Sequence, residues 1–146
     1  MDPNYQMTAE ERNLGHRSHS EWLGKGDMEV VYELFAADCD VHSRYIPPQM
    51  SHGIDAFKGY ATFLRTAFPD IKITDESIVA EGDRVLIRWS FTGTHSGEFF
   101  GLPGTGKTVS MGGFDIFRVK DGKIQELWLE NDYLTLMQQL GLAPSQ

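Results

Sequence analysis

Residues 114–130 read FDIFRVKDGKIQELWLE, two strand-like runs on either side of the tetrapeptide KDGK. Its Asp121-Gly122 pair is the strongest short signal of a two-residue β-hairpin turn. Just upstream, every second residue from Val85 to Phe91 is apolar or aromatic after a turn at EGDR, residues 81–84. Together with isoleucines at 71, 73 and 78, these runs predict an antiparallel meander of strands near 71–79, 85–92, 107–119 and 124–130.

The first half of the chain has helical rather than alternating periodicity. Thr8 and Glu11 have capping-box spacing, which predicts a first helix that continues without proline to Gly24. Asp27 can cap a second helix over the apolar residues 30–35, and a third is expected from about 55 to 67, closed by Pro69. A short edge strand and a proline loop fit residues 39–50.

Helices followed by a meander indicate the α+β class, with the helices on one face of the sheet. At 146 residues the chain fits one domain, residues 1–146. If the antiparallel sheet is strongly curved, it forms a cone-shaped barrel under the N-terminal helices. Such a cone would enclose a mainly apolar pocket for a small apolar or aromatic ligand.

Composition excludes several classes of protein. The net charge of -8 opposes binding to nucleic acid, because that affinity depends on Lys and Arg. The single cysteine, Cys39, cannot form an internal disulfide, and no segment has the roughly 20 apolar residues of a membrane span. A cytoplasmic location and no membrane partner are therefore expected.

The loop at 101–108, GLPGTGKT, satisfies the letters of the phosphate-binding pattern GxxxxGK[ST]. That motif joins a buried parallel strand to a helix, whereas the residues that follow here alternate and contain Gly112 and Gly113. A wide hairpin connection is the favoured interpretation, and nucleotide binding is the lesser alternative.

Four segments carry a resemblance to a known family: AFPDIKI at 67–73, GDRVLIRWSFTGTHSGEFFGLPGTGK at 82–107, FDIFRVKDGKI at 114–124 and WLENDYLTLMQQLG at 128–141. Together they resemble the SnoaL-like polyketide cyclases of the nuclear-transport-factor-2-like (NTF2-like) superfamily. The resemblance implies a cone-shaped α+β barrel, a homodimer formed through the sheet, and neither metal nor organic cofactor. It also implies an ester cyclase that closes a ring by an intramolecular aldol reaction.

The resemblance places an acid/base Asp at the end of the last strand, which is Asp132 here. Relatives also carry a His in the preceding strand, but this chain has none there, so Asp115 is the acid/base candidate in that strand. From the residues alone, alternation from Ile124 puts Asp132 on the same face as Trp128, where burial would raise the pKa of its carboxyl. The alternative is that Asp132 caps the terminal helix, residues 133–140.

Other polar candidates are histidines. His42, before the proline loop, is a candidate for proton transfer or for stabilising an oxyanion, although a surface position is equally consistent. His95 is a candidate pocket residue whose place in the GTH motif favours holding the following loop. His16 and His19 are three apart on the first helix, but nothing nearby completes a metal site. Five aromatic residues, which core packing would equally explain, are candidates for contact with the ligand: Trp22, Tyr60, Phe63, Trp89 and Trp128.

Three functions follow. The leading one is an acid/base enzyme, cyclase-like lyase or ketosteroid-isomerase-like, acting on an apolar carbonyl compound without cofactor. For the isomerase, the base would fall near Asp40 or Ser43, a poor match. The second is a noncatalytic binder of a hydrophobic molecule. The third is epoxide hydrolysis by an Asp, Arg and Asp cluster that Arg88, Asp115 and Asp132 could supply, although alternation favours solvent for Arg88.

Overall fold

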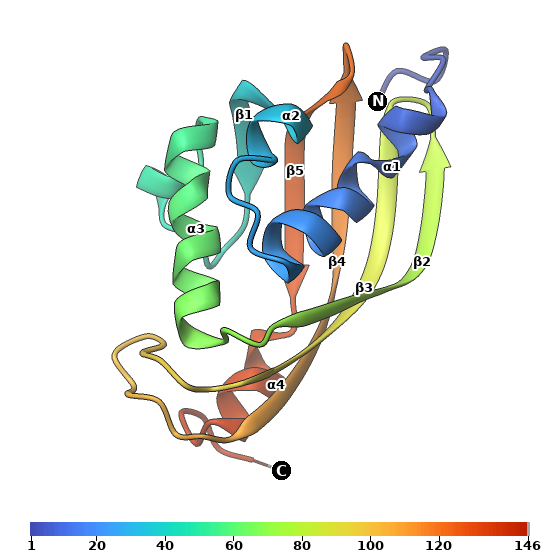
Figure 1. The fold of residues 1–146 in the computed structure, drawn as a ribbon. Coiled ribbons are helices and arrows are strands. Elements are labelled where there is room, and N and C mark those ends of the chain that lie inside the picture. Colours follow the sequence, from blue (N-terminus) through green and yellow to red (C-terminus); the bar gives the residue numbers. More distant parts are fainter. Residues whose placement is uncertain (146) are drawn as a thin grey trace.

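The computed structural model describes residues 1–145 (Figure 1). Four α-helices, one π-helix (η1), one 3-10 helix (η2) and five strands follow each other in these residues. In chain order they are α1 (Ala9–Arg17), η1 (Ser18–Gly24), α2 (Val31–Leu34), β1 (Phe35–His42), η2 (Pro48–Met50), α3 (Ile54–Ala67), β2 (Lys72–Glu81), β3 (Arg84–Thr94), β4 (Thr108–Lys120), β5 (Lys123–Asn131) and α4 (Tyr133–Gln139). Within the same residues, no helix combines the length and apolar character needed to cross a bilayer.

The five strands form one curved sheet in the order β1-β5-β4-β3-β2. The meander from β2 to β5 is antiparallel, as predicted, and Asp121 and Gly122 both take positive φ in its last turn. The edge strand β1 is parallel to β5, so the sheet is mixed and not wholly antiparallel as expected. β1 and β2 lie at opposite edges and do not pair, so the cone remains open.

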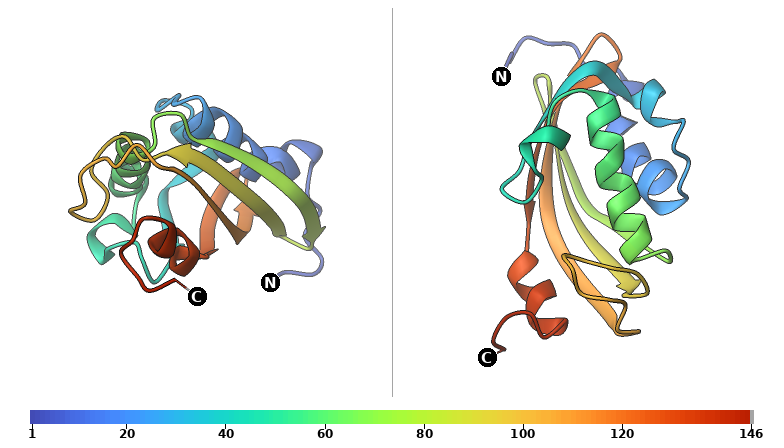
Figure 2. Two further views of the ribbon diagram at one scale, coloured as in Figure 1. Left: turned by 90° about the horizontal axis from the view of Figure 1, so that it is seen from below. Right: turned by 90° about the vertical axis from the view of Figure 1, so that its left-hand side faces the viewer.

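The helices α1, α2 and α3 lie on one face of this sheet, and Figure 2 shows the opposite face uncovered. The α+β class and the cone of a curved sheet beneath N-terminal helices are confirmed. The predicted capping box is present at the start of α1, where Thr8 accepts from the Glu11 amide. The second helix, predicted over residues 30–35, spans only Val31–Leu34, because Phe35 already begins β1.

Two irregularities in the strands decide which side chains face the helices. In β5, Ile124 pairs with Val119 and Glu126 pairs with Arg118, so Gln125 is an extra residue. In β2, Asp75 pairs with Trp89 and Ser77 with Arg88, so Glu76 is extra. Each β-bulge resets the inside-outside alternation beyond it.

Candidate active site

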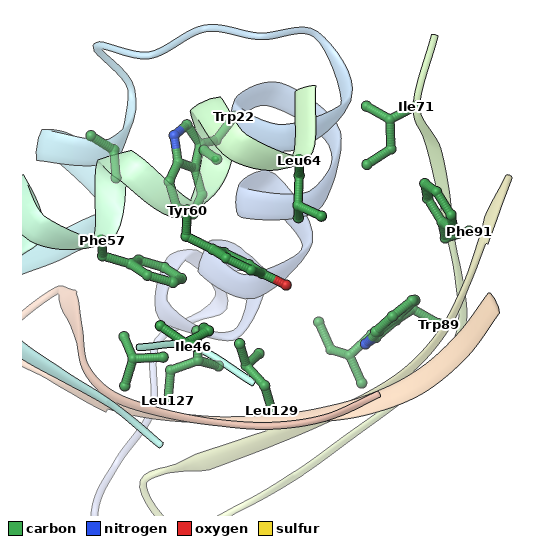
Figure 3. Close-up of a cluster of buried hydrophobic side chains, with 14 of the residues drawn as sticks. Trp22, Ile46, Phe57, Tyr60, Leu64, Ile71, Trp89, Phe91, Leu127 and Leu129 are labelled. Carbon is green, nitrogen blue, oxygen red and sulfur yellow. The ribbon is translucent and has the colours of Figure 1, made fainter. Parts of the chain in front are cut away.

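A mainly apolar cavity lies between the concave face of the sheet and the helices. It is lined by Ser18, His19, Trp22, Leu23, Phe35, Phe57, Tyr60, Leu64, Phe68, Ile71, Ile73, Trp89, Phe91, Met111, Asp115, Phe117, Leu127, Leu129, Asn131 and Leu136. Figure 3 shows part of this wall, with the Tyr60 hydroxyl reaching into the space bounded by Leu64, Trp89 and Leu129. Few polar side chains interrupt the lining, so each of them has a strong influence on what can bind.

The Asp115 carboxylate is the acidic group in this lining, and the residue is only 3% exposed. Its Oδ2 lies 2.8 Å from Nε2 of His19, and its Oδ1 accepts from the Trp89 indole N–H at 3.0 Å. Two hydrogen bonds to different oxygens fix the orientation of the carboxyl group. A buried carboxylate is therefore held in one position at the cavity wall.

The His19 imidazole lies between two carboxylates. Its Nδ1 lies 2.6 Å from Oδ1 of Asp75, opposite the bond to Asp115, and the residue is 4% exposed. Burial by itself lowers the pKa of His19, but the hydrogen bonds and negative charges of Asp115 and Asp75 outweigh it and raise the pKa to about 9. His19 is therefore an imidazolium near neutral pH, donating from both ring nitrogens.

Asp75 links this buried group to the protein surface. Its Oδ2 lies 2.8 Å from Nδ1 of His16, whose side chain is 45% exposed. Burial alone would raise the pKa of Asp75, but its bonds to His19 and His16 and their charges lower it. The result is a chain of alternating partners, His16–Asp75–His19–Asp115, ending at the cavity.

Three local features bring these groups together. Gly15 approaches β4 so closely that a Cβ there would lie 2.7 Å from Phe117, and His19 follows one turn later. His19 itself belongs to the π-helix η1, a rare geometry that occurs frequently at functional sites. The extra residue Glu76 allows both Asp75 and Ile78 to face the helices although they are three positions apart.

Gly113 makes room for the indole that contacts Asp115. A Cβ on Gly113 would lie 2.5 Å from Cζ2 of Trp89 and 2.7 Å from the carbonyl oxygen of Glu130. Only glycine at position 113 leaves room for the Trp89 ring to lie against β4. The glycine pair that argues against a phosphate-binding loop in the sequence therefore includes a residue needed for packing. The strand β4 begins at Thr108, directly after the GLPGTGK loop, and no helix follows that loop.

Residues 15–140 match the family described as SnoaL-like polyketide cyclase. The chain belongs to this family. It is 32% identical over 108 residues to aklanonic acid methyl ester cyclase DnrD of Streptomyces peucetius, covering 69% of this chain and 74% of DnrD. Among solved structures, IdmH from Streptomyces antibioticus is 34% identical with a TM-score of 0.77, over 90% of this chain and 98% of IdmH. TsrD from Streptomyces laurentii is 25% identical with a TM-score of 0.82, over 94% of this chain and 99% of TsrD.

Asp132 follows the last strand directly, as the motif places it, but its side chain does not line the cavity. Asp132 is exposed and caps α4, accepting from the Thr135 amide at 3.2 Å and from the Thr135 hydroxyl at 2.6 Å. Gln125 is the physical reason: the extra residue turns Leu127, Leu129 and Asn131 inward. The capping alternative is confirmed.

The same shift places Trp128 on the outer face, outside the cavity lining. His42 of β1, its register partner, also lies outside the lining, which agrees with the surface alternative for this histidine. Their rings stack with centroids 5.2 Å apart, and His42 Nε2 lies 2.6 Å from Glu126. The Arg84 guanidinium also lies over the Trp128 ring, 4.6 Å from its centroid. These three side chains pack on the outer surface of the sheet.

Two further candidates also lie away from the cavity lining. Phe63 stacks on Phe99 with centroids 5.3 Å apart, in an aromatic cluster beside the Gly-rich loop. His95 is fully buried and lies 2.9 Å from the Thr105 hydroxyl, so it holds that loop, the role favoured by its position in the GTH motif. Trp22, Tyr60, Trp89 and Asp115 do lie in the cavity wall of the SnoaL-like fold.

The clusters required by two alternative reactions do not form. Arg88 is exposed on the outer face and Asp132 is exposed at the helix cap, so neither joins Asp115 in an Asp, Arg and Asp cluster. Asp40, the isomerase-like candidate, is half exposed and pairs with His52 on the surface. Sequence reasoning missed His19 and Asp75, although His19 is four residues after Gly15 and three before Trp22, on the apolar side of the helix.

Proposed function

We propose that this protein is an acid/base cyclase that closes a ring by an intramolecular aldol reaction within an apolar carbonyl substrate, with Asp115 as the base. The observation that carries the proposal is a buried, hydrogen-bonded carboxylate in the wall of an apolar cavity. Membership of the SnoaL-like polyketide cyclase family supports this reaction class, and so does the ester cyclase activity in the name of the relative DnrD.

In the proposed reaction, Asp115 takes one proton from the substrate and later returns it. Asp115 removes a proton from a carbon next to a carbonyl, and the electron pair passes to the carbonyl oxygen. The resulting enolate attacks a second carbonyl carbon, which forms the new C–C bond, and the alkoxide then takes the proton from Asp115. The apolar lining keeps water away from the enolate.

The choice of a carboxylate as base limits the substrates. A carboxylate is a weak base by comparison with the carbanion of a simple ketone, and both oxygens of Asp115 already accept hydrogen bonds, from His19 and Trp89. The hydrogen to be removed must therefore be acidic in the free substrate. A carbon between two carbonyl groups, as in a β-keto ester, meets this requirement.

The test uses aklanonic acid methyl ester, the compound in the name of DnrD, together with simpler aromatic β-keto esters that carry a further ketone as the internal acceptor. Chromatography with mass spectrometry would detect a product of unchanged mass and altered retention. Asp115→Asn is expected to lower turnover by roughly 10²- to 10⁴-fold, the usual contribution of a positioned base. The matched control is Asp132→Asn. It replaces the carboxylate at the helix cap outside the cavity by an amide that can also cap, so turnover should be retained.

If turnover is instead lost in Asp132→Asn and kept in Asp115→Asn, then Asp132 is the acid/base residue, as the family motif predicts. Equal binding by wild type and Asp115→Asn without turnover of any of these esters would favour the noncatalytic binder. These outcomes separate the two carboxylates and the two functions.

We also propose that a second copy of the chain covers the outer face of the sheet. Val79, Leu86, Ile116 and Trp128 are register partners in four adjacent strands and form an apolar row there. Phe114, on the same face, is 49% exposed. Sedimentation should show a dimer that Phe114→Glu weakens at least tenfold, whereas a monomeric wild-type chain would refute the proposal.

A further inference from the structure

Tyr60 brings a second chemically active group into the cavity, from the opposite wall to Asp115. It projects from α3 with its ring stacked on Phe57, the centroids 5.6 Å apart. The residue is 6% exposed, and its hydroxyl reaches the space beside Trp89 (Figure 3). A phenol in this position can donate one hydrogen bond to a ligand.

A second phenol lies next to the Tyr60 hydroxyl. The Tyr133 oxygen is 3.1 Å from the Tyr60 oxygen, and Tyr133 is 2% exposed at the first position of α4. Tyr60 borders the cavity and Tyr133 is not part of its lining. When Tyr133 donates to Tyr60, the Tyr60 proton is left for an acceptor in the cavity.

The surroundings keep Tyr60 protonated. Burial, the neighbouring Tyr133 and the negative charge of Asp115 together raise the pKa of Tyr60 well above its ordinary value. Burial likewise raises the pKa of Tyr133. The cavity thus combines the Asp115 carboxyl group on β4 with a neutral O–H donor on α3.

The same end of the cavity contains a polar atom without a partner. Asn131 lies in the cavity lining, and its buried Oδ1 accepts no hydrogen bond. An amide oxygen is an acceptor, so it suits a hydroxyl group of the ligand and not an oxygen that gains negative charge. The donor for a charged ligand oxygen at this end of the cavity is therefore the Tyr60 hydroxyl.

We infer that Tyr60 is a further catalytic residue, which donates its hydroxyl hydrogen bond to the substrate oxygen that becomes the enolate oxygen, and that Tyr133 is the positioning residue that holds it. The inference rests on the proposed function. As the proton passes from the substrate carbon to Asp115, the electron pair moves to the carbonyl oxygen, which accepts the Tyr60 hydrogen bond. Tyr60 keeps its proton throughout, and the bound oxyanion is an enolate or phenolate conjugated with an aromatic system.

The test uses 2-hydroxyanthraquinone, whose visible absorption changes when its hydroxyl ionises. In wild type, the oxygen of the ionised probe accepts a hydrogen bond from Tyr60. Tyr60→Phe should weaken binding and reduce the ionised fraction at least tenfold, and Tyr133→Phe should cause a smaller loss of the same kind. Tyr32→Phe, at an exposed tyrosine that hydrogen-bonds Asp55 on the surface, is the matched control.

Turnover of the β-keto esters gives the second readout. Tyr60→Phe should lower kcat by about 10²- to 10³-fold with little change in KM, as expected for a lost oxyanion donor. An unchanged ionised fraction, a change in KM alone, or no binding of the probe by wild type would each overturn the inference. If Asp115→Asn abolishes turnover while Tyr60→Phe does not, the inference fails and the proposed function stands.

Discussion

Oδ2 of Asp115 and Nε2 of His19 lie 2.8 Å apart although 96 residues separate them in the chain. Both side chains are almost fully buried, and the other ring nitrogen of His19 is bonded to Asp75. One positive charge thus compensates two negative charges inside the molecule. The position of the proposed base depends on this contact.

Removal of the His19 charge should destabilise the fold. In His19→Gln, an amide replaces the imidazolium and the two carboxylates lose their buried counter-charge, which typically costs about 3–5 kcal/mol. Urea unfolding would measure the change in free energy of unfolding. The control His42→Gln removes an imidazole from a half-exposed surface pair and should change stability by less than about 1 kcal/mol. Similar losses in the two variants would contradict the buried role of His19.

The hairpins of this fold could be predicted from sequence because each depends on neighbouring residues. Asp121 and Gly122 set one turn by their own backbone preferences, and the alternation in β3 follows from burial of one face. The parallel pairing of β1 with β5 could not be predicted in this way. It joins Val41 to Leu127 across 86 positions, and nothing local to either strand specifies its direction.

The candidate site was predicted only in part, for a similar reason. Tyr60, Trp89 and Asp115 follow an undisturbed periodicity, and all three lie in the cavity wall together with Trp22. Asp132 and Trp128 come after the extra residue Gln125, so counting by twos from Ile124 assigned them to the wrong face. A bulge is set by pairing with the next strand, which the strand's own sequence does not reveal.

The stability of the protein should fall as pH rises above neutrality. The pKa of His19 rises from an ordinary 6.5 to about 9 on folding, because its hydrogen bonds to Asp115 and Asp75 outweigh burial. The folded state therefore binds the proton more tightly, and this stabilisation is complete below about pH 6.5 and lost as pH passes through 9. At 1.4 kcal/mol per pKa unit, the loss is roughly 3 kcal/mol.

Urea unfolding of wild type and His19→Gln at pH 6.5, 8 and 9.5 would measure this effect. The groups that face His19 are Asp75 and Asp115, with His16 on the far side of Asp75. The wild-type free energy of unfolding should decline across the series more steeply than that of the variant. Parallel curves would show that His19 is not the group responsible.

Gly113→Ala should disturb the indole that contacts Asp115. The new Cβ would lie 2.5 Å from Trp89 Cζ2 and 2.7 Å from a backbone oxygen, so the Trp89 ring must move. Overpacking of this kind costs about 1–3 kcal/mol, and near-ultraviolet circular dichroism would report the displaced ring. In the control Gly112→Ala, the nearest atom is 3.5 Å from the new Cβ, an ordinary contact. Equal effects of the two substitutions would contradict the packing described for Trp89.

Asp132 should behave as a helix cap and not as a base. Its carboxylate accepts from the Thr135 amide, so Asp132→Ala leaves that amide without its partner and should cost about 1 kcal/mol. Asp132→Asn supplies another favourable cap and should cost much less. Thermal unfolding of the two variants would measure the difference, and turnover of the β-keto esters by Asp132→Asn would be close to wild type. Because asparagine can cap but cannot take a proton, a stable but inactive Asp132→Asn would show that the exposed carboxylate takes part in catalysis after all.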